Sequence, residues 1–136
     1  MDFLLITTEG ELKKISFDNA SDFRSKFCSL IGNGCSSVKQ MWFLVSHNAS
    51  GNYLMWLDEE GLLNNQPANE VASYLSRKAY SGETLSGNII VTMGEEEVIT
   101  GILDWEMIPL MQEAGRYQYG FLKKQQYKEL NEEKEK

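Results

Sequence analysis

Residues 2–17 read DFLLITTEGELKKISF, and this stretch decides the fold that we expect for the chain. Its first part, Asp2–Thr8, reads as a strand, and the run Phe3–Ile6 within it is apolar on both faces. A strand with two apolar faces is covered on both sides, so we expect it in the centre of a sheet. Glu9-Gly10 supplies a turn, and Leu12–Phe17 alternates apolar and polar residues, as expected of its hairpin partner.

The chain after this hairpin passes through helical and strand-like patterns in turn. Apolar residues recur at helical spacing from about Ala20 to Ile31, with Asn19 or Ser21 as the expected cap. The remaining expected elements are strands at Val38–Ser46, Tyr53–Leu57, Gly87–Met93 and Val98–Leu103, a short helix from Asn69 to Ser76, and a helix after Asp104. This order predicts an α+β domain, a small and mostly antiparallel sheet of about six strands with two or three helices packed on it.

Several local features carry expectations of their own. Leu62-Leu63 follows an acidic turn and is expected to re-enter the core. Asn69 follows Pro67-Ala68 and is expected to cap the short helix, with contact to a ligand as the alternative. Of the three tryptophans, Trp42 and Trp56 are expected to pack on the sheet, and Trp105 is expected to be partly exposed.

The final helical region contains residues that limit a helix. Pro109 is best accommodated in a first turn, so the helix is expected to begin near Ile108, and Gly115 and Gly120 are candidate breaks. Its expected inward face combines Trp105 and Ile108 with Met111 and Met107. We expect one domain over residues 1–115 and, over residues 116–136, either a C-terminal helix or a partly disordered charged tail. Within that segment, basic and aromatic residues alternate, and we expect them to dock an amphipathic helix, with contact to an acidic partner as the alternative. These residues are Arg116, Tyr117, Tyr119, Phe121, Lys123 and Lys124.

The 136 residues and 15.5 kDa correspond to one domain, and the charge is unevenly distributed along it. The net charge is −7, and residues 51–115 alone carry eleven acidic and two basic residues. This balance argues against direct binding to nucleic acid or to an anionic membrane. The sequence has no apolar run of about 18 residues and no basic start typical of a signal peptide, which predicts a cytoplasmic protein.

The residues that usually carry catalysis or bind metals are few and scattered. Cys28 and Cys35 with His47 fall short of the four ligands of a structural zinc site, and we predict no metal and no cofactor. His47 lies in a polar loop without a nucleophile in a recognisable arrangement, and no phosphate-binding glycine motif is present. We therefore predict a protein that is not an enzyme.

The middle of the chain resembles domain-of-unknown-function family 3846, whose members are frequent in phages and mobile elements of bacteria. The resemblance is carried by Trp56–Leu63, by Pro67-Ala68-Asn69 before the short helix, and by Gly87–Val91 with the turn glycine Gly94. It covers roughly residues 1 to 110. Where such proteins often carry a Gly-Gly pair after the first helix, this chain has Gly32-Asn33-Gly34-Cys35. The resemblance implies a phage-encoded accessory or host-takeover protein that acts in the bacterial host cell.

The acidic middle segment and this resemblance together lead to the first hypothesis about function. The protein is expected to bind and inhibit a host protein, such as a nuclease or an immune effector, by presenting an acidic surface that competes with nucleic acid. The residues expected to form that surface are Asp58, Glu59, Glu60, Glu95, Glu96, Glu97, Asp104, Trp105 and Glu106.

A small-molecule function is the alternative. A sponge for a nucleotide signal, assembled as a homo-oligomer with a pocket at its subunit interfaces, needs cations for an anionic ligand. The candidate contacts are Asn69, Arg77, Lys78 and Arg116. An accessory domain without an inhibitory role is the third possibility.

Overall fold

The computed structural model describes residues 1–18, 23–32, 34–43, 45, 53–95 and 98–134. Apart from a 3-10 helix at Lys78–Ser81, the helices and strands within these residues are those that the periodicity predicts. Their bounds differ by a few residues, and by more in the last helix. In chain order they are β1 (Asp2–Ile6), β2 (Leu12–Ser16), α1 (Phe23–Ile31), β3 (Val38–Phe43), β4 (Tyr53–Asp58), α2 (Glu70–Leu75), the 3-10 helix η1 (Lys78–Ser81), β5 (Ile89–Glu95), β6 (Val98–Thr100) and α3 (Asp104–Lys134).

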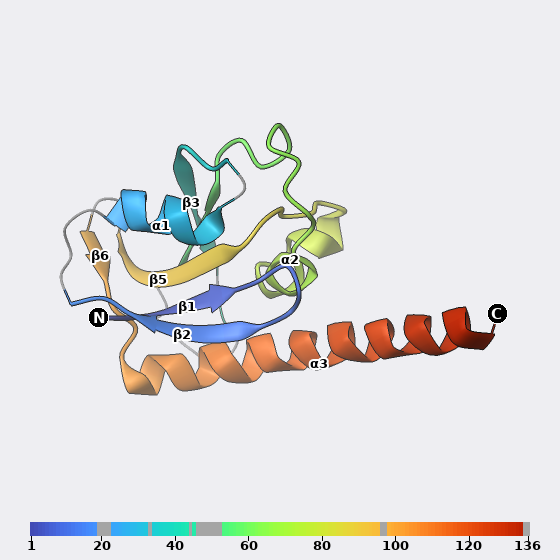
Figure 1. The fold of residues 1–136 in the computed structure, drawn as a ribbon. Coiled ribbons are helices and arrows are strands. Elements are labelled where there is room, and N and C mark those ends of the chain that lie inside the picture. The colour runs from blue at the N-terminus through green and yellow to red at the C-terminus, as the bar shows by residue number, and fades with distance from the viewer. Residues whose placement is uncertain (19–22, 33, 44, 46–52, 96–97, 135–136) are drawn as a thin grey trace.

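The strands form one six-stranded sheet in the order β2-β1-β5-β4-β3, and β6 also pairs with β5. Every pairing is antiparallel, which confirms the expected α+β architecture. β1 lies between β2 and β5, in the interior position that its apolar run predicts (Figure 1). β5 is the hub of the sheet because it pairs with three other strands.

The alternation of side chains along the strands divides the core into two clusters. In β1, Phe3 and Leu5 belong to one cluster, and Leu4 and Ile6 belong to the other. All four side chains are buried, because helices cover both faces of the sheet. The result is a sheet between two helical layers, with α1 on one face and α2 with α3 on the other (Figure 1).

The face under α1 is aromatic. Phe27 lies in this helix, and its ring centroid is 5.7 Å from that of Phe3 and 5.5 Å from that of Trp56. The indole Nε1 of Trp56 donates to Thr92 Oγ1 at 2.9 Å, so its one polar group is satisfied inside the core. Trp56 is therefore core, as expected, whereas Trp42 on the edge strand β3 is half exposed.

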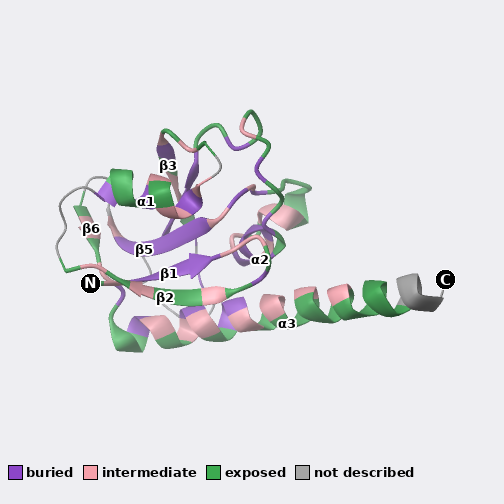
Figure 2. Cartoon of the chain, in the orientation of Figure 1, coloured by how far each residue is buried: buried purple, intermediate pink, exposed green. Residues whose placement is uncertain are grey.

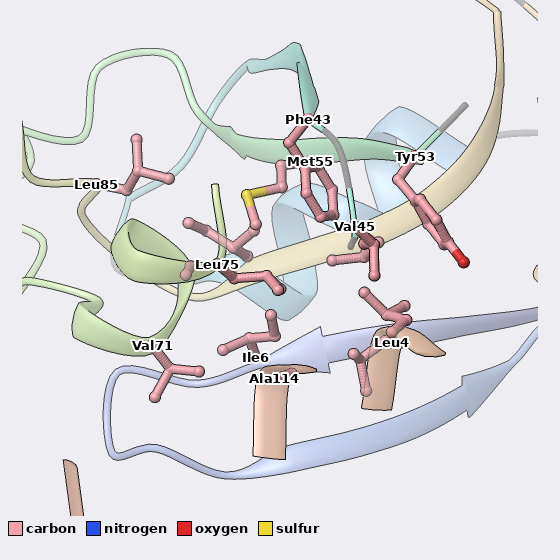
Figure 3. Packing of buried hydrophobic residues seen from close by; sticks show 14 of the residues in the cluster. Leu4, Ile6, Phe43, Val45, Tyr53, Met55, Val71, Leu75, Leu85 and Ala114 are labelled. Carbon is pink, nitrogen blue, oxygen red and sulfur yellow. The ribbon is translucent and has the colours of Figure 1, made fainter. Parts of the chain in front are cut away.

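The opposite face is mainly aliphatic and receives α2 and α3. Figure 3 shows Leu75 of α2 and Ala114 of α3 converging on Ile6 of β1 and Met55 of β4. A tyrosine ties the start of α3 to the sheet, since the Tyr53 hydroxyl donates to the Glu106 carbonyl at 2.6 Å. This face therefore fixes where both helices lie.

α3 begins earlier and runs longer than we expected. It starts at Asp104, where Glu106 Oε1 accepts a hydrogen bond from the Leu103 N–H at 3.1 Å and so caps the first turn. Pro109 consequently lies inside the helix rather than near its first residue, and the missing N–H removes one hydrogen bond from the second turn. Neither Gly115 nor Gly120 ends the helix, so these expectations were wrong.

The inward face of α3 also differs from the expected one. Met107 and Met111 pack against the core, as expected, but the buried positions are Leu110 and Ala114. Trp105 and Ile108 are each 58% exposed. The capping carboxylate sets this rotation, because a buried Glu106 places positions 110 and 114 toward the sheet. The exposure of Trp105 itself agrees with the expectation.

The C-terminal half of α3 leaves the domain. The last turn that packs on the sheet contains Gln118, whose Nε2 donates to the Gly10 carbonyl at 3.0 Å, and Phe121, which lies against Gly10. Gly10 has a φ of +85°, and a Cβ there would lie 2.6 Å from the Phe121 ring, so this contact requires glycine. From residue 122 to residue 130 the helix is largely exposed (Figure 2).

Candidate functional site

The acidic turn after β4 is organised around one buried carboxylate. Asp58 ends β4 opposite Val38 of β3 and is only 3% exposed. Its Oδ1 accepts the Glu60 N–H at 2.9 Å, and its Oδ2 accepts from Asn64 Nδ2 at 2.8 Å and Gln66 Nε2 at 3.1 Å. The buried Asp58 carboxylate therefore fixes the loop that follows it, residues 59–66, through hydrogen bonds from that loop.

These hydrogen bonds decide the charge state of Asp58. Burial on its own raises the pKa of this carboxyl, but the bonds donated by Asn64, the Glu60 backbone and Gln66 outweigh burial and lower the pKa. The group is therefore an anion at neutral pH. A buried anion with several donors is a strong anchor for a loop.

The 59–66 loop is also tied to the turn that follows α1. Asn64 Nδ2 donates to the Gly34 carbonyl at 3.3 Å, and Gln66 Nε2 donates to the Gly32 carbonyl at 3.0 Å. At its start, Ser37 Oγ donates to Glu59 Oε2 at 2.9 Å. The loop is therefore held at both ends and in its middle.

Leu62 and Leu63 project from this loop into solvent, 85% and 80% exposed. They do not re-enter the core, and that expectation was wrong. The Asn64 N–H donates to the Glu60 carbonyl and the Gln66 N–H donates to the Gly61 carbonyl, which places both leucines on the outer side of the turn. They border a groove of about 510 Å³ that is also lined by Lys39, Glu59, Glu60 and Glu83.

The remaining acidic residues of the expected surface lie elsewhere. Asp104 is exposed at the start of α3, and Glu106 is buried there. Glu95 is the last residue of β5, and Glu96 and Glu97 lie outside the described residues.

The two acidic regions lie at opposite ends of β5. Trp56 of β4, two residues before Asp58, pairs with Ile90 near the start of β5, whereas β6 pairs with the last residues of β5. Figure 1 shows the same separation, with the green loop on the side of α2 and β6 on the side of the N-terminus. The sequence-based set is thus not one surface.

Asn69 caps α2, as the sequence predicts. Its Oδ1 accepts the Ala72 N–H at 3.0 Å, and its Nδ2 donates to the carbonyls of Ile6 at 3.0 Å and Gly87 at 2.9 Å. The side chain is completely buried, and it joins α2 to the end of β1 and to the segment just before β5. The structure gives Asn69 a structural role and leaves no exposed atom for a ligand.

The three cations of the alternative hypothesis lie around the end of α2. Arg77 follows this helix with a φ of +65°, and Lys78 Nζ is 3.5 Å from Glu83 Oε2. Arg116 lies on α3 and lines a separate cleft between α3 and the α2 region. The aromatic residues of this cleft, Tyr74 and Tyr80 with Tyr117, were not among the predicted site residues. Sequence reasoning did not find this cleft; the signal that could have found it is the spacing of Arg116, Gly120 and Lys124 along one helical face.

Cys35 is a thiol rather than a reactive thiolate. Burial, together with the neighbouring Cys28 thiol, raises the pKa of Cys35 to about 12. Both cysteines are free and partly buried, and Cys35 Sγ lies 3.5 Å from the Ser37 carbonyl. His47 lies outside the described residues. Within the part of the chain that the structure describes, no cluster of His, Cys, Asp and Glu could hold a metal ion.

No helix among the described ranges is both long and apolar enough to cross a membrane. Comparison of the chain with protein-family models, with curated proteins and with solved structures gives no match. Membership of the resembled family therefore stays a prediction.

Proposed function

We propose that this chain is a non-enzymatic, phage-type binding protein that docks on a host protein through the 59–66 loop and inhibits it. The observation that carries the proposal is the exposure of Leu62 and Leu63 on a loop held by the buried Asp58 carboxylate. Apolar side chains of this size are rarely presented together on a fixed turn unless they meet a partner. The proposal keeps the acidic-surface hypothesis for the 59–66 loop only, and it leaves out the acidic residues near β6 and the start of α3.

The preorganised loop favours binding because little conformational freedom is lost on association. Hydrogen bonds to Asp58, Gly32 and Gly34 hold the backbone on either side of the leucines. Leu62 and Leu63 are therefore presented to a partner on an ordered loop rather than on a disordered segment. Preorganisation of this kind raises affinity by lowering the entropic cost of association.

The charges beside the leucines define the partner's chemistry. Glu59 and Glu60 are exposed, and Glu83 lines the same groove. Lys39 is the one basic residue among those that line it. A partner surface that complements the leucines and the surrounding glutamates has an apolar pocket with basic residues around it. Basic surfaces of this kind occur on proteins that bind nucleic acid. Occupying such a surface would block the phosphate backbone, and this is how we propose that the host nuclease or immune effector is inhibited.

Photo-crosslinking tests the contact directly. A photoreactive amino acid at position 63 should capture a partner in a bacterial lysate, whereas the same probe at Val98, which is 67% exposed at the other end of β5, should not. The purified partner's nucleic-acid activity is then measured with and without the protein. The proposal expects inhibition that weakens as the salt concentration rises.

A pair of matched charge reversals makes this test specific. Glu59→Lys/Glu60→Lys should weaken partner binding by about tenfold or more and flatten its salt dependence. The control Glu9→Lys/Glu11→Lys changes the net charge equally at exposed positions of the β1–β2 turn, and it should bind like the wild type. Equal affinities for both variants would remove the loop from the interface, and binding without inhibition would indicate an accessory domain instead.

A further inference from the structure

A second candidate site lies in the cleft between α3 and the end of α2. It encloses about 190 Å³, which is smaller than the roughly 300 Å³ at the low end of drug-sized ligand pockets. A cleft of this size accommodates one ring and leaves the rest of a ligand outside. The cleft contains none of the residues of the 59–66 loop.

Tyrosine rings form the cleft. Tyr74 and Tyr117 stack with ring centroids 5.8 Å apart and an interplanar angle of 19°, and Tyr80 meets Tyr74 edge-on at 5.8 Å. Burial and the neighbouring Tyr80 hydroxyl raise the pKa of Tyr117, so its hydroxyl keeps its proton. The cleft therefore offers aromatic faces together with the neutral hydroxyl group of Tyr117. Flat rings with polar edges are recognised by surfaces of this kind.

The cations at the cleft are notable in a chain of net charge −7. Arg116 and Lys124 are exposed and line it, and the Lys124 Nζ lies 5.8 Å from the centroid of the Tyr74 ring. Among the described residues, neither cation forms an ion pair. Of the described residues that line the cleft, Glu70 alone carries a carboxylate. A guanidinium and an ammonium beside an aromatic slot match a phosphate attached to a ring.

Gly120 keeps the cleft open. It lies on the face of α3 between Arg116 and Lys124, and a Cβ placed on it would meet no atom within 4 Å. A larger side chain at this position would therefore fill the cleft without colliding with the protein. Gly115, one of the other helical glycines, is equally unobstructed but does not line the cleft.

We propose that this cleft binds a mononucleotide, with the base against Tyr74 and Tyr117 and the phosphate between Arg116 and Lys124. The small enclosed volume favours a single nucleotide over a polynucleotide. The net negative charge of the chain also disfavours a long polyanion. This site is independent of the protein-docking loop, so either proposal can fail without the other.

The test compares two glycine variants by isothermal titration calorimetry with the four common ribonucleoside monophosphates. Wild type and Gly115→Leu should bind at least one of them with similar affinity. Gly120→Leu should weaken binding by more than about tenfold because the base has no room. Both substitutions replace a helical glycine, so they should have similar effects on folding, which circular dichroism checks.

Charge and ligand variants complete the test. Arg116→Gln should weaken nucleotide binding by about tenfold, and the corresponding nucleoside or inorganic phosphate alone should bind at least about tenfold more weakly than the nucleotide. Three results would overturn the proposal: no binding of any nucleotide, unchanged binding by Gly120→Leu, or binding only of a single-stranded oligonucleotide.

Discussion

The 59–66 loop and the α2–α3 cleft are built in opposite ways. The loop is held by polar bonds to the buried Asp58 and presents two apolar side chains to solvent. The cleft is formed by stacked tyrosines and presents charged side chains at its edge. In each case the chemistry that fixes the site differs from the chemistry it displays. Substitutions can therefore separate the stability of each region from its binding function.

Of the effects expected within the loop and the cleft, the largest concerns the polar anchor of the loop. In Asp58→Asn an NH₂ group replaces one acceptor oxygen and faces at least one of the donors from Glu60, Asn64 and Gln66. Because these donors are left unsatisfied, we expect the free energy of unfolding to fall by about 3 kcal/mol in urea denaturation. Asp104→Asn is the control, since its side chain is 96% exposed and its ion pair with Lys14 is long, at 4.0 Å, and it should change stability by less than about 0.5 kcal/mol. Similar losses for both variants would refute the anchoring role.

The same carboxylate predicts a pH dependence. The pKa of Asp58 is lower in the folded chain than the value of about 3.9 expected when unfolded, so its contribution to stability is present above that value. It is lost as the pH falls through the lower pKa of the folded state. The difference in unfolding free energy between wild type and Asp58→Asn should therefore shrink below about pH 4. A difference that stays constant from pH 7 to pH 2.5 would contradict this assignment.

A smaller effect is expected from the aromatic scaffold of the cleft. Tyr74→Leu keeps an apolar side chain but removes the stack on Tyr117 and the contact with Lys124, and it should cost about 1 kcal/mol. Tyr119→Leu is the matched control on an exposed position of α3, with an expected change below about 0.5 kcal/mol. Thermal unfolding of both variants would distinguish them, and equal melting temperatures would mean that the stack adds nothing.

The smallest expected effect belongs to the two exposed leucines. Leu62→Ser/Leu63→Ser should change stability by less than about 0.5 kcal/mol, because neither side chain is buried in the folded chain. Leu110→Ala, which removes a completely buried side chain, should cost about 2–5 kcal/mol. A large loss for the double serine variant would show that the leucines stabilise the fold rather than serve a partner.

The sequence predicted those parts of the fold that depend on local pattern. The apolar run of β1 indicated an interior strand, and Pro67-Ala68-Asn69 indicated the cap of α2. Both features can be predicted because strand burial and helix capping determine the residue types within a short stretch of sequence. It could not predict the direction of Leu62-Leu63. An apolar pair reads the same way whether a turn points it inward or outward, and that direction depends on hydrogen bonds to Asp58 from residues further along the loop.

The candidate sites were harder to predict because they combine distant parts of the chain. The cleft requires Tyr74 of α2 to stack on Tyr117 of α3. The sequence around either tyrosine gives no indication that it contacts the other. The acidic residues were assigned to one surface because they are close in sequence, but strand pairing separates them to the two ends of β5. Burial of Asp58 and Glu106 then gives two of those carboxylates structural roles.

The length of α3 has a consequence for amide hydrogen exchange. Amides near Leu110 and Ala114 are in the core and exchange only when the packed helix opens, whereas the part of the helix after Lys124 reaches about 15 Å further at 1.5 Å per residue. An unsupported helical segment is marginal in water, so its amides exchange by fraying. Protection should therefore decline along a single continuous helix. A nucleotide that bridges Tyr74 and Lys124 would move the point of decline toward the C-terminus.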